Sequence, residues 1–452
     1  MTKMKLGYLA LSKASWMTPR IEAIAADTHR NLQTLDAEIL YDGVTVTEAE
    51  AGDRARQFAS AGVDGVIMHF ATFPVGAAVS AAAMELDVPI LLLANPEEAG
   101  PGQMWEQNSF CGANMAAHGL RRLAKPYSFV FGHPAETVRE LAASLAALRV
   151  RRALRRQRVG LIGGRVPGFY TSNCDELQLR RDLGTTVEVV DQLEVVRASE
   201  TLSDDEIAVG REALGKIAKR VNQVDDAELL LAARLYVALG KTTVKYRLTS
   251  LAVRCWPEWG DLFGIAPCAV IGMLNDHGLL TSCEGDVTGA VSMELLRAAA
   301  GDGLPFFVDL IQFDYERNTG VVWHCGAAPS GLCRRFDETQ LRKHMRVDGG
   351  DKKGVTNDFA LKPGRITLAK YDTDVDGRQR LLLAAGEAMD TEPFIRGNPL
   401  RIRFDGAVKN LVGAIMDKGF EHHYAVIHAD VAEPLRHFAR WQGIELVEPE
   451  LK

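Results

Sequence analysis

Three short segments in the second half of the chain place ionisable side chains at the ends or on the faces of apolar strands. Glu284 follows the apolar run of "LLTSCEGDVTG", Asp309 lies within "FFVDLIQF", and His324 lies in "GVVWHCG". A buried carboxylate is costly unless it is paired or bound to a metal ion. Carboxylate oxygens and imidazole nitrogens without thiolates suit Mn²⁺ or Mg²⁺, and the same carboxylates could exchange protons with a substrate.

Two of these residues have a structural interpretation as well. Glu284 lies at the carboxyl end of a predicted strand, where open α/β sheets bind ligands, but Glu284 or Asp286 could simply cap the helix that follows. Asp286 suits the cap, which leaves Glu284 without a structural role. His324 could equally be a core histidine whose hydrogen bonds are satisfied.

A predicted hairpin brings Asp309 and His324 together. The turn "ERNTG" joins their two strands, so folding back places the two residues within a rung or two of each other. On a regular strand Asp309 shares a face with the apolar Phe307, Ile311 and Phe313. Asp309 is therefore expected either to bind a metal ion or to form a salt bridge with an arginine from elsewhere in the chain.

The segment "KGFEHHYAVIHADVAEPL" (418–435) contains three histidines beside a predicted strand. Successive side chains of a strand point to opposite faces, so we expect that His422 and His423 do not reach the same point. Alternation groups His422 with Tyr424 and His428, and places His423 on the other face. The pattern alone leaves the three histidines as equal candidates for a site.

The elements that must position these residues are those of an α/β protein. Over the first 150 residues, short apolar runs alternate with amphipathic helices, which indicates βαβ units and a parallel sheet. A second such unit begins at "RVGLIGG" (158–164), whose glycines lack the GxGxxG spacing of a dinucleotide site. From Leu304 onward, strands separated by Gly, Asp and Asn turns predict a mostly antiparallel β domain.

We therefore predict two Rossmann-like parallel-sheet domains followed by a mostly antiparallel β domain. The predicted boundaries are 1–155, 156–302 and 303–452. The formal charge of −7 argues against a nucleic-acid partner, and no apolar stretch approaches the roughly 20 residues of a membrane helix. Seven scattered cysteines without a CxxC pair predict a cytoplasmic protein without a disulfide framework or a thiolate zinc site.

The same segments resemble the L-arabinose/L-fucose isomerase superfamily. The resemblance is carried by "CEGDVTGA", by "FFVDLIQFDYERNTGVVWHCGAAP" and by "HHYAVIHADVAEPLRHFARWQGIEL", of which residues 422–439 align without a gap. In the N-terminal part, "GVIMHFATFPVGAAV" and "NMAAHGLRR" are similar to family segments. The resemblance thus spans nearly the whole chain.

This resemblance implies an aldose–ketose isomerase that acts on a pentose or hexose through an enediol. The implied metal ligands are Glu284, Asp309 and His423, with His324 as a fourth, and the implied metal is Mn²⁺, with Mg²⁺ or Co²⁺ as alternatives. Glu284 and Asp309 would also be the catalytic acid/base pair, and which of them is the base stays open.

The resemblance also implies residues that contact the sugar. His118 matches a substrate-binding histidine that reaches the site from a neighbouring subunit, which implies a homo-oligomer with its site near a subunit interface. His422 would form hydrogen bonds near the site, whereas His428 would be structural. The second acid is Asp309, as in fucose isomerases, while His324 is arabinose-like, so the sugar stays open and could carry an anionic group.

Two other functions remain as alternatives at this point. A non-catalytic sugar-binding protein would also contain two Rossmann-like domains, but it would not need buried carboxylates at 284 and 309. A metal-dependent sugar epimerase or aldolase would keep the site and change the reaction.

Overall fold

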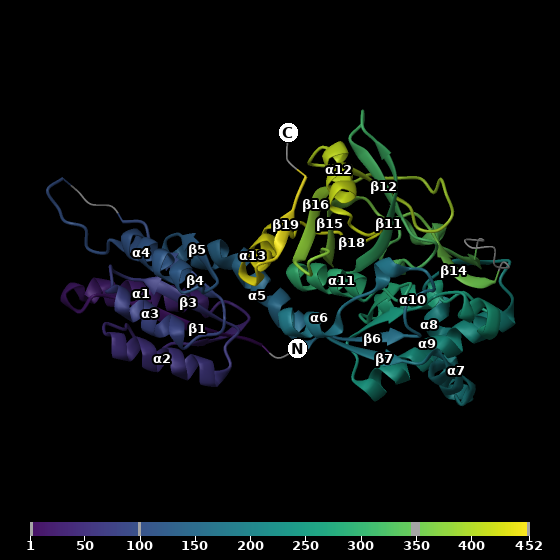
Figure 1. Cartoon of the computed structure of the whole chain (residues 1–452), viewed down its shortest axis with the longest axis horizontal. Helices are drawn as coiled ribbons and strands as arrows, with labels where there is room; N and C mark the ends of the chain where they lie inside the picture. Colours follow the sequence, from purple (N-terminus) through teal and green to yellow (C-terminus); the bar gives the residue numbers. More distant parts are fainter. Residues whose placement is uncertain (1–2, 98–100, 345–352, 450–452) are drawn as a thin grey trace. The chain divides into compact units, whose positions relative to one another are not determined.

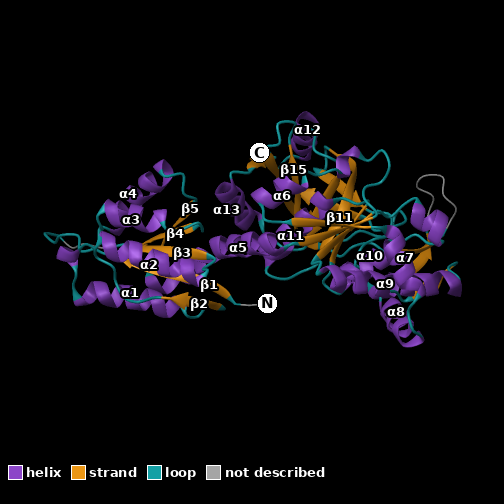
Figure 2. Ribbon diagram, turned by 60° about the horizontal axis from the view of Figure 1, so that its bottom comes forward, coloured by secondary structure: helices purple, strands orange, loops and turns teal. Residues whose placement is uncertain are grey.

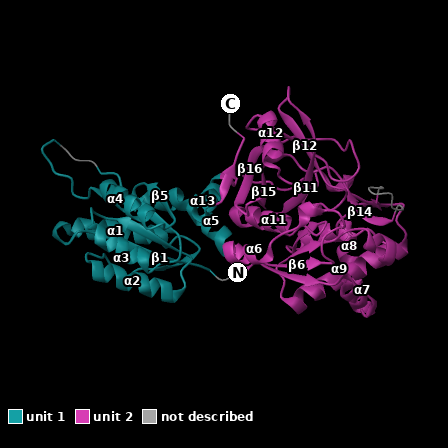
Figure 3. Cartoon of the chain, viewed as in Figure 1, with its two compact units in different colours: residues 1–152, 433–443 teal, residues 153–432, 444–452 magenta. Residues whose placement is uncertain are grey.

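The chain divides into two compact units (Figure 3). The computed structural model describes residues 3–97, 101–344 and 353–449. Unit 1 comprises Met1–Arg152 and Glu433–Gly443, and unit 2 comprises Ala153–Ala432 and Ile444–Lys452. The finer division at 155 and 302 stays a prediction.

Unit 1 is built on a five-stranded parallel sheet in the order β2-β1-β3-β4-β5. Its strands are β1 (Met4–Leu11), β2 (Ala37–Leu40), β3 (Gly65–Phe70), β4 (Ile90–Ala94) and β5 (Tyr127–Phe131). Its helices are α1 (Pro19–Leu32), α2 (Glu48–Ala61), α3 (Gly76–Met84), α4 (Ser109–Arg122), α5 (Thr137–Arg156) up to Arg152, and α13 (Ala432–Gln442) from Glu433. This strand order is that of a doubly wound sheet, with helices on both faces (Figure 2).

Helix α13 belongs to unit 1 although it lies near the end of the sequence. The side chain of Ser128 on β5 holds two of its residues: Trp441 Nε1 donates to Ser128 Oγ at 2.9 Å, and His437 Nδ1 lies 2.7 Å from the same oxygen. Leu435 and Phe438 of α13 are fully buried. Unit 1 is therefore assembled from two segments that are far apart in the sequence.

Unit 2 begins with a four-stranded parallel sheet in the order β10-β9-β6-β7. Its strands are β6 (Arg158–Ile162), β7 (Thr186–Val190), β9 (Ser250–Val253) and β10 (Leu280–Cys283). Its helices are α6 (Glu176–Asp182), α7 (Gln192–Glu200), α8 (Asp204–Lys216), α9 (Asp226–Tyr246), α10 (Cys268–Asp276) and α11 (Val287–Ala300).

The second half of unit 2 is a closed antiparallel β-barrel of six strands, which can be followed in Figure 1. The strands follow one another as β15, β18, β11, β12, β17 and β16, and β16 pairs with β15 to close the ring. Their bounds are β11 (Pro305–Asp314), β12 (Thr319–Trp323), β15 (Gly364–Thr373), β16 (Gln379–Ala388), β17 (Leu400–Phe404) and β18 (His423–Ile427). The predicted fold class is thus confirmed: two parallel sheets precede a mostly antiparallel β part.

Further elements flank the barrel. Strand β19 (Glu445–Val447) pairs in parallel with β16, and α12 (Val408–Lys418) follows β17. Strands β13 (Gln340–Lys343), β14 (Gly354–Asp358) and β8 (Arg220–Asn222) form a separate small sheet. Within the described residues, no helix is both long enough and apolar enough to cross a membrane.

Helix α11 lies between the parallel sheet and the barrel, and it packs against strands of both. Apolar side chains from all six barrel strands, such as Phe306 and Tyr424, form one core. Because side chains alternate along a strand, their neighbours Phe307 and His423 point out of the barrel towards α11. The approach is closest at Gly289, where an added Cβ would lie only 2.3 Å from Phe307 Cε2. This packed layer positions the candidate site.

Candidate active site

Glu284 lies where the parallel sheet meets the barrel. It directly follows β10, and its backbone has φ +59°, a left-handed conformation that is uncommon for a residue with a side chain. Gly285 follows with φ +68°, and Asp286 then caps α11 by accepting a hydrogen bond from Gly289 N at 2.8 Å. The predicted cap at Asp286 is confirmed.

The barrel supplies the other candidate residues from three neighbouring strands. In the ladder between β11 and β18, Asp309 lies directly opposite His423. In the ladder between β11 and β12, Asp309 lies opposite Trp323, and His324 is the next residue. The prediction that the hairpin brings Asp309 and His324 within a rung or two of each other is therefore confirmed. The alternative, an arginine paired with Asp309, is not found among the described residues.

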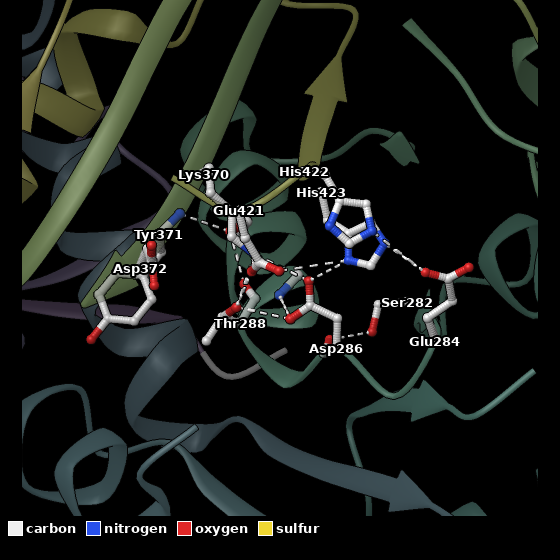
Figure 4. Close-up of polar contacts among 12 residues, drawn as sticks. Ser282, Glu284, Asp286, Thr288, Lys370, Tyr371, Asp372, Glu421, His422 and His423 are labelled. Atoms are coloured by element: carbon white, nitrogen blue, oxygen red, sulfur yellow. Dashed lines mark hydrogen bonds and ion pairs between the residues drawn. The ribbon is translucent and has the colours of Figure 1, made fainter. Parts of the chain in front are cut away.

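The imidazole of His423 connects the two sides of the site (Figure 4). Its Nε2 lies 2.8 Å from Glu284 Oε2 and 3.9 Å from Asp309 Oδ1, and the ring is fully buried. The Phe307 ring packs against it, with 4.5 Å between ring centroids. The structure thus brings Glu284, Asp309 and His423 together within one small volume.

The expectation that His422 and His423 do not reach the same point is wrong. His422 Nε2 lies 3.8 Å from the same Glu284 oxygen, and the two imidazole rings are 3.8 Å apart. The reason is that β18 begins only at His423, so strand alternation does not govern His422. The His422 side chain is half-exposed. His428 lies away from Glu284 and His423, and its Nε2 donates a hydrogen bond to Lys362 O at 2.8 Å.

A β-bulge changes the face that Asp309 shares. The register between β11 and β12 shifts between Leu310 and Gln312, so Ile311 is the extra residue and is 45% exposed. Phe313 packs instead with the core of the barrel. The prediction that Asp309 shares a face with Ile311 and Phe313 is therefore wrong.

A buried polar network contacts His423 at Nδ1, the ring nitrogen that does not face Glu284. Its Nδ1 lies 3.1 Å from Asp286 Oδ2, and Lys370 Nζ on β15 donates to the same oxygen at 3.1 Å. Lys370 also pairs with Glu421 and donates to Thr288 Oγ1 at 2.9 Å (Figure 4). Lys370, Asp286 and His423 are all fully buried.

Sequence reasoning missed Lys370 and Glu421. Lys370 lies in the run "ITLAKYD", where a lysine on a strand normally points to solvent, and no local signal shows that the closed barrel and α11 bury it. A buried lysine must be paired, and here both Asp286 and Glu421 pair with it.

The two candidate carboxylates have pKa values that move in opposite directions. Burial works to raise the pKa of Glu284, but hydrogen bonds with His422 and His423 outweigh burial and hold that pKa well below its usual range. Burial raises the pKa of Asp309, and the charges of His324 and His423 offset this only in part. One carboxyl is therefore kept ionised while the other is disposed to hold a proton.

The imidazoles respond to the same acidic surroundings. Burial works to lower the pKa of His423, but Asp286 and Glu284 raise it to about 10. Burial also opposes protonation of His324, whereas Cys325 and Asp309 raise its pKa to about 9. The acidic surroundings therefore favour a positive charge where His423 and His324 lie.

The residues present fit a divalent metal ion. Asp309 Oδ1 and His324 Nε2 are buried and have no hydrogen-bond partner among the described residues. Ligand atoms of Glu284, His422 and His423 lie within 4.8 Å of one another. Oxygen and nitrogen donors in acidic surroundings suit Mn²⁺ or Mg²⁺, and Asp286 on His423 Nδ1 provides the carboxylate that orients a metal-binding histidine.

His118 lies in unit 1 and is exposed on α4. It is not among the residues that unit 2 brings together around Glu284, and its role in the site stays a prediction.

Comparison with known proteins identifies the family. Residues 11–155 match the model of the fucose/sulfoquinovose isomerase N-terminal domain. The sulfoquinovose isomerase of Alkalicoccus urumqiensis is 31% identical over 90% of each chain, and that of Priestia aryabhattai is 29% identical over 85% of each chain. The resemblance inferred from the sequence is confirmed, and the non-catalytic sugar-binding alternative is wrong. The chain therefore belongs to the fucose/sulfoquinovose isomerase family and is a sugar aldose–ketose isomerase.

Proposed function

We propose that the protein is a Mn²⁺-dependent isomerase that converts a sulfonated aldose, sulfoquinovose or a close analogue, into its ketose. The observation that carries this proposal is the convergence of Glu284, Asp309 and His423 at the edge of the parallel sheet. The names of the relatives support the substrate. Mg²⁺ and Co²⁺ are alternative ions for the same oxygen and nitrogen donors.

Isomerisation moves a proton from C2 to C1 of the open-chain sugar and another from O2 to O1. In the proposed mechanism, one of the carboxylates Glu284 and Asp309 takes the C2 proton and returns it at C1, and the other carries the proton between the two oxygens. Glu284, Asp309 and His423 would hold the ion, with His324 as a fourth ligand. The ion, when bound, supplies Lewis-acid stabilisation of the negative charge that develops on the sugar oxygens.

Two further histidines are assigned to the substrate. His422 is half-exposed beside Glu284, and this position supports the proposal that its imidazole forms a hydrogen bond with a sugar hydroxyl. His118, exposed on α4, is proposed to contact the sugar bound by a neighbouring subunit, so the working enzyme would be a homo-oligomer.

The direct test follows the sugar by NMR in D₂O. Sulfoquinovose should be converted to its ketose, with deuterium at C1 to the extent that the carboxyl exchanges its proton with solvent before returning it; EDTA should stop the conversion, and added Mn²⁺ should restore it. Conversion that survives complete removal of the metal would contradict the proposal. Aldol cleavage products or a C2 epimer without ketose would favour a different reaction at the same site.

Glu284→Gln and Asp309→Asn should each lower kcat by about 10³-fold, because each removes a group that transfers protons. Glu294→Gln is the matched control, since Glu294 is a buried carboxyl on α11 that pairs with Arg297 outside the site. Its activity should stay close to that of the unmodified enzyme. Full activity of either site variant would remove that residue from the mechanism.

A further inference from the structure

The loop that follows β6 borders the site on the side of Glu284. A Cβ added to Gly285 would lie 2.4 Å from Gly164 O and 3.0 Å from Arg165 Cα, so this loop packs directly against the turn that carries Glu284. Further along the loop, the Phe169 ring lies 5.7 Å from the His422 ring. The loop therefore touches the site at two points.

Arg165 is a cation without an acidic partner at this edge. Its guanidinium lies over the Tyr170 ring, 5.1 Å from the centroid, and Nη1 donates only a long 3.5 Å hydrogen bond to Val166 O. Among the residues that the structure describes, no carboxylate lies within ion-pair distance of it. Arg254, at the end of the neighbouring strand β9, is different, because it pairs with Glu258 and donates to Gly163 O at 3.2 Å.

A half-buried arginine without a carboxylate beside a sugar site has a clear chemical use. The guanidinium presents a planar set of N–H donors that matches two oxygens of an oxyanion, and it stays charged at all physiological pH values. In the proposed mechanism, the carboxylates Glu284 and Asp309 transfer protons at C1, C2 and their oxygens, at the reacting end of the sugar. An anion at the other end of the sugar would need a separate cation.

We propose that Arg165 binds the terminal anionic group of the substrate, a sulfonate on C6, and thereby selects sulfonated over neutral sugars. This inference rests on the proposed isomerase function and adds the residue that sets its specificity. Four carbon–carbon bonds separate C2 from C6, a span of about 5 Å in an extended sugar. Arg165 is near the site at both ends of its side chain. Its backbone packs against Gly285, the residue next to Glu284. Its guanidinium lies over Tyr170, the residue next to Phe169, whose ring packs against His422.

The test compares two sugars that differ only at C6, sulfoquinovose and 6-deoxyglucose (quinovose). Dissociation constants are measured by titration calorimetry on the full-length, Mn²⁺-loaded protein, and turnover is measured in parallel. Arg165→Met should weaken sulfoquinovose binding by about 10- to 100-fold, because a charge-assisted hydrogen bond is lost. Quinovose binding should change by less than about 3-fold. Arg165→Lys should give an intermediate affinity for sulfoquinovose, since lysine keeps the positive charge but lacks the planar pair of N–H donors that binds two oxygens at once.

Arg211→Met is the control variant, because Arg211 is an exposed residue of α8 that pairs with Asp226. It should leave both affinities unchanged. Equal affinity of the unmodified protein for the two sugars, an unchanged sulfoquinovose affinity in Arg165→Met, or equal losses for both sugars would each overturn the assignment. Tighter binding of glucose 6-phosphate than of sulfoquinovose would overturn the choice of sulfonate.

Binding and turnover separate this inference from the proposed function. Arg165-dependent binding of sulfoquinovose without conversion would contradict the isomerase substrate but support the subsite. Conversion that does not depend on Arg165 would support the function and contradict the subsite.

Discussion

Each ring nitrogen of His423 faces a different carboxylate. Asp286 lies at Nδ1 and is fixed by Lys370 and by the backbone of α11, whereas Glu284 lies at Nε2 on the side of the candidate metal site. A carboxylate behind a histidine fixes the orientation of the ring and raises its basicity as a ligand. The buried pair of Lys370 and Asp286 therefore acts on the site through His423.

Replacing His423 or His428 separates a site histidine from a structural one. His423→Gln should lower Mn²⁺ affinity by at least about 10-fold and abolish turnover, because it removes the nitrogen proposed to bind the ion. His428→Gln should keep the metal and cost about 1 kcal/mol of unfolding free energy, because only its bond to Lys362 O is lost. Metal content after dialysis and urea unfolding measure the two effects. Metal loss in His428→Gln with retention in His423→Gln would show that the wrong histidine was chosen.

The buried His69 on β3 should make the stability of unit 1 depend on pH. Its imidazole is fully buried between Tyr8 Oη, 2.7 Å from Nδ1, and Asn95 Oδ1. Burial lowers its pKa to about 4. In the unfolded chain the pKa is about 6.5, so between these values the unfolded state binds more protons and stability falls as the pH falls.

The expected loss from His69 is about 3 kcal/mol between pH 7 and pH 4. His69→Gln, which cannot titrate, should be less stable at pH 7 and should lose less stability on acidification. Denaturant-dependent hydrogen exchange of peptides from β3 measures this locally. An equal acid response in both proteins would show that His69 titrates normally in the folded state.

At the level of single residues, the sequence indicates ionisable groups at positions where the local pattern predicts burial. Glu284 and Asp309 are predicted as site residues because each lies at or within an apolar strand, and His423 because of the family resemblance. The structure brings the three side chains together, and their roles stay predictions. Lys370 and Glu421 were not found, because their burial depends on packing between β15, α11 and the segment before β18, which no local pattern encodes.

At the level of elements, strand alternation failed where a strand ends or carries an extra residue. His422 precedes β18, and Ile311 is inserted in β11. Within β18 the alternation is regular, since Tyr424 and Val426 belong to the barrel core whereas His423 faces Asp286 and Glu284 outside it. Such boundaries and bulges depend on pairing with neighbouring strands, so a single segment does not reveal them.

The close packing of α11 on β11 makes a testable prediction. Gly289→Ala would place a methyl group 2.3 Å from Phe307 Cε2 and 2.8 Å from Asp286 Oδ2, so both side chains that hold His423 must shift. We expect a loss of about 1–3 kcal/mol in unfolding free energy together with weaker Mn²⁺ binding.

The matched control is Gly240→Ala in α9, where an added Cβ meets nothing within 4 Å. Alanine in that helix should be neutral or stabilising by about 0.5–1 kcal/mol. Thermal unfolding and metal titration measure both variants. An unchanged metal affinity in Gly289→Ala would mean that α11 does not position the histidine.

At the level of the whole molecule, the order of the sheets could be predicted but the membership of α13 could not. The alternation of apolar runs and helices indicates each sheet, because neighbours in the sequence usually become neighbours in space. Helix α13 follows the barrel strand β18 in the sequence, yet it packs in unit 1 through Ser128 on β5. Nothing in the local sequence of α13 signals a partner roughly 300 residues away.

Trp441→Ala should therefore destabilise a sheet made from the other end of the chain. The indole is buried and donates to Ser128 Oγ, so its removal should cost about 3–5 kcal/mol in unit 1. Hydrogen exchange should accelerate in β5, while the barrel strands β11 and β12 stay protected. Arg440→Ala, an exposed neighbour on α13, should change stability by less than about 0.5 kcal/mol. Faster exchange confined to the barrel would contradict this assignment of α13.

The return of α13 to unit 1 also has a consequence for synthesis on the ribosome. The five strands of unit 1 are made first, but their last helix follows only after residues Ala153–Ala432, which takes roughly 14–56 s at about 5–20 residues per second. During that time the surface that α13 later covers, including Ser128, stays without its partner. The nascent N-terminal segment is thus a stretch where chaperones should bind during translation, and a ribosome stalled before Glu433 would leave it incomplete.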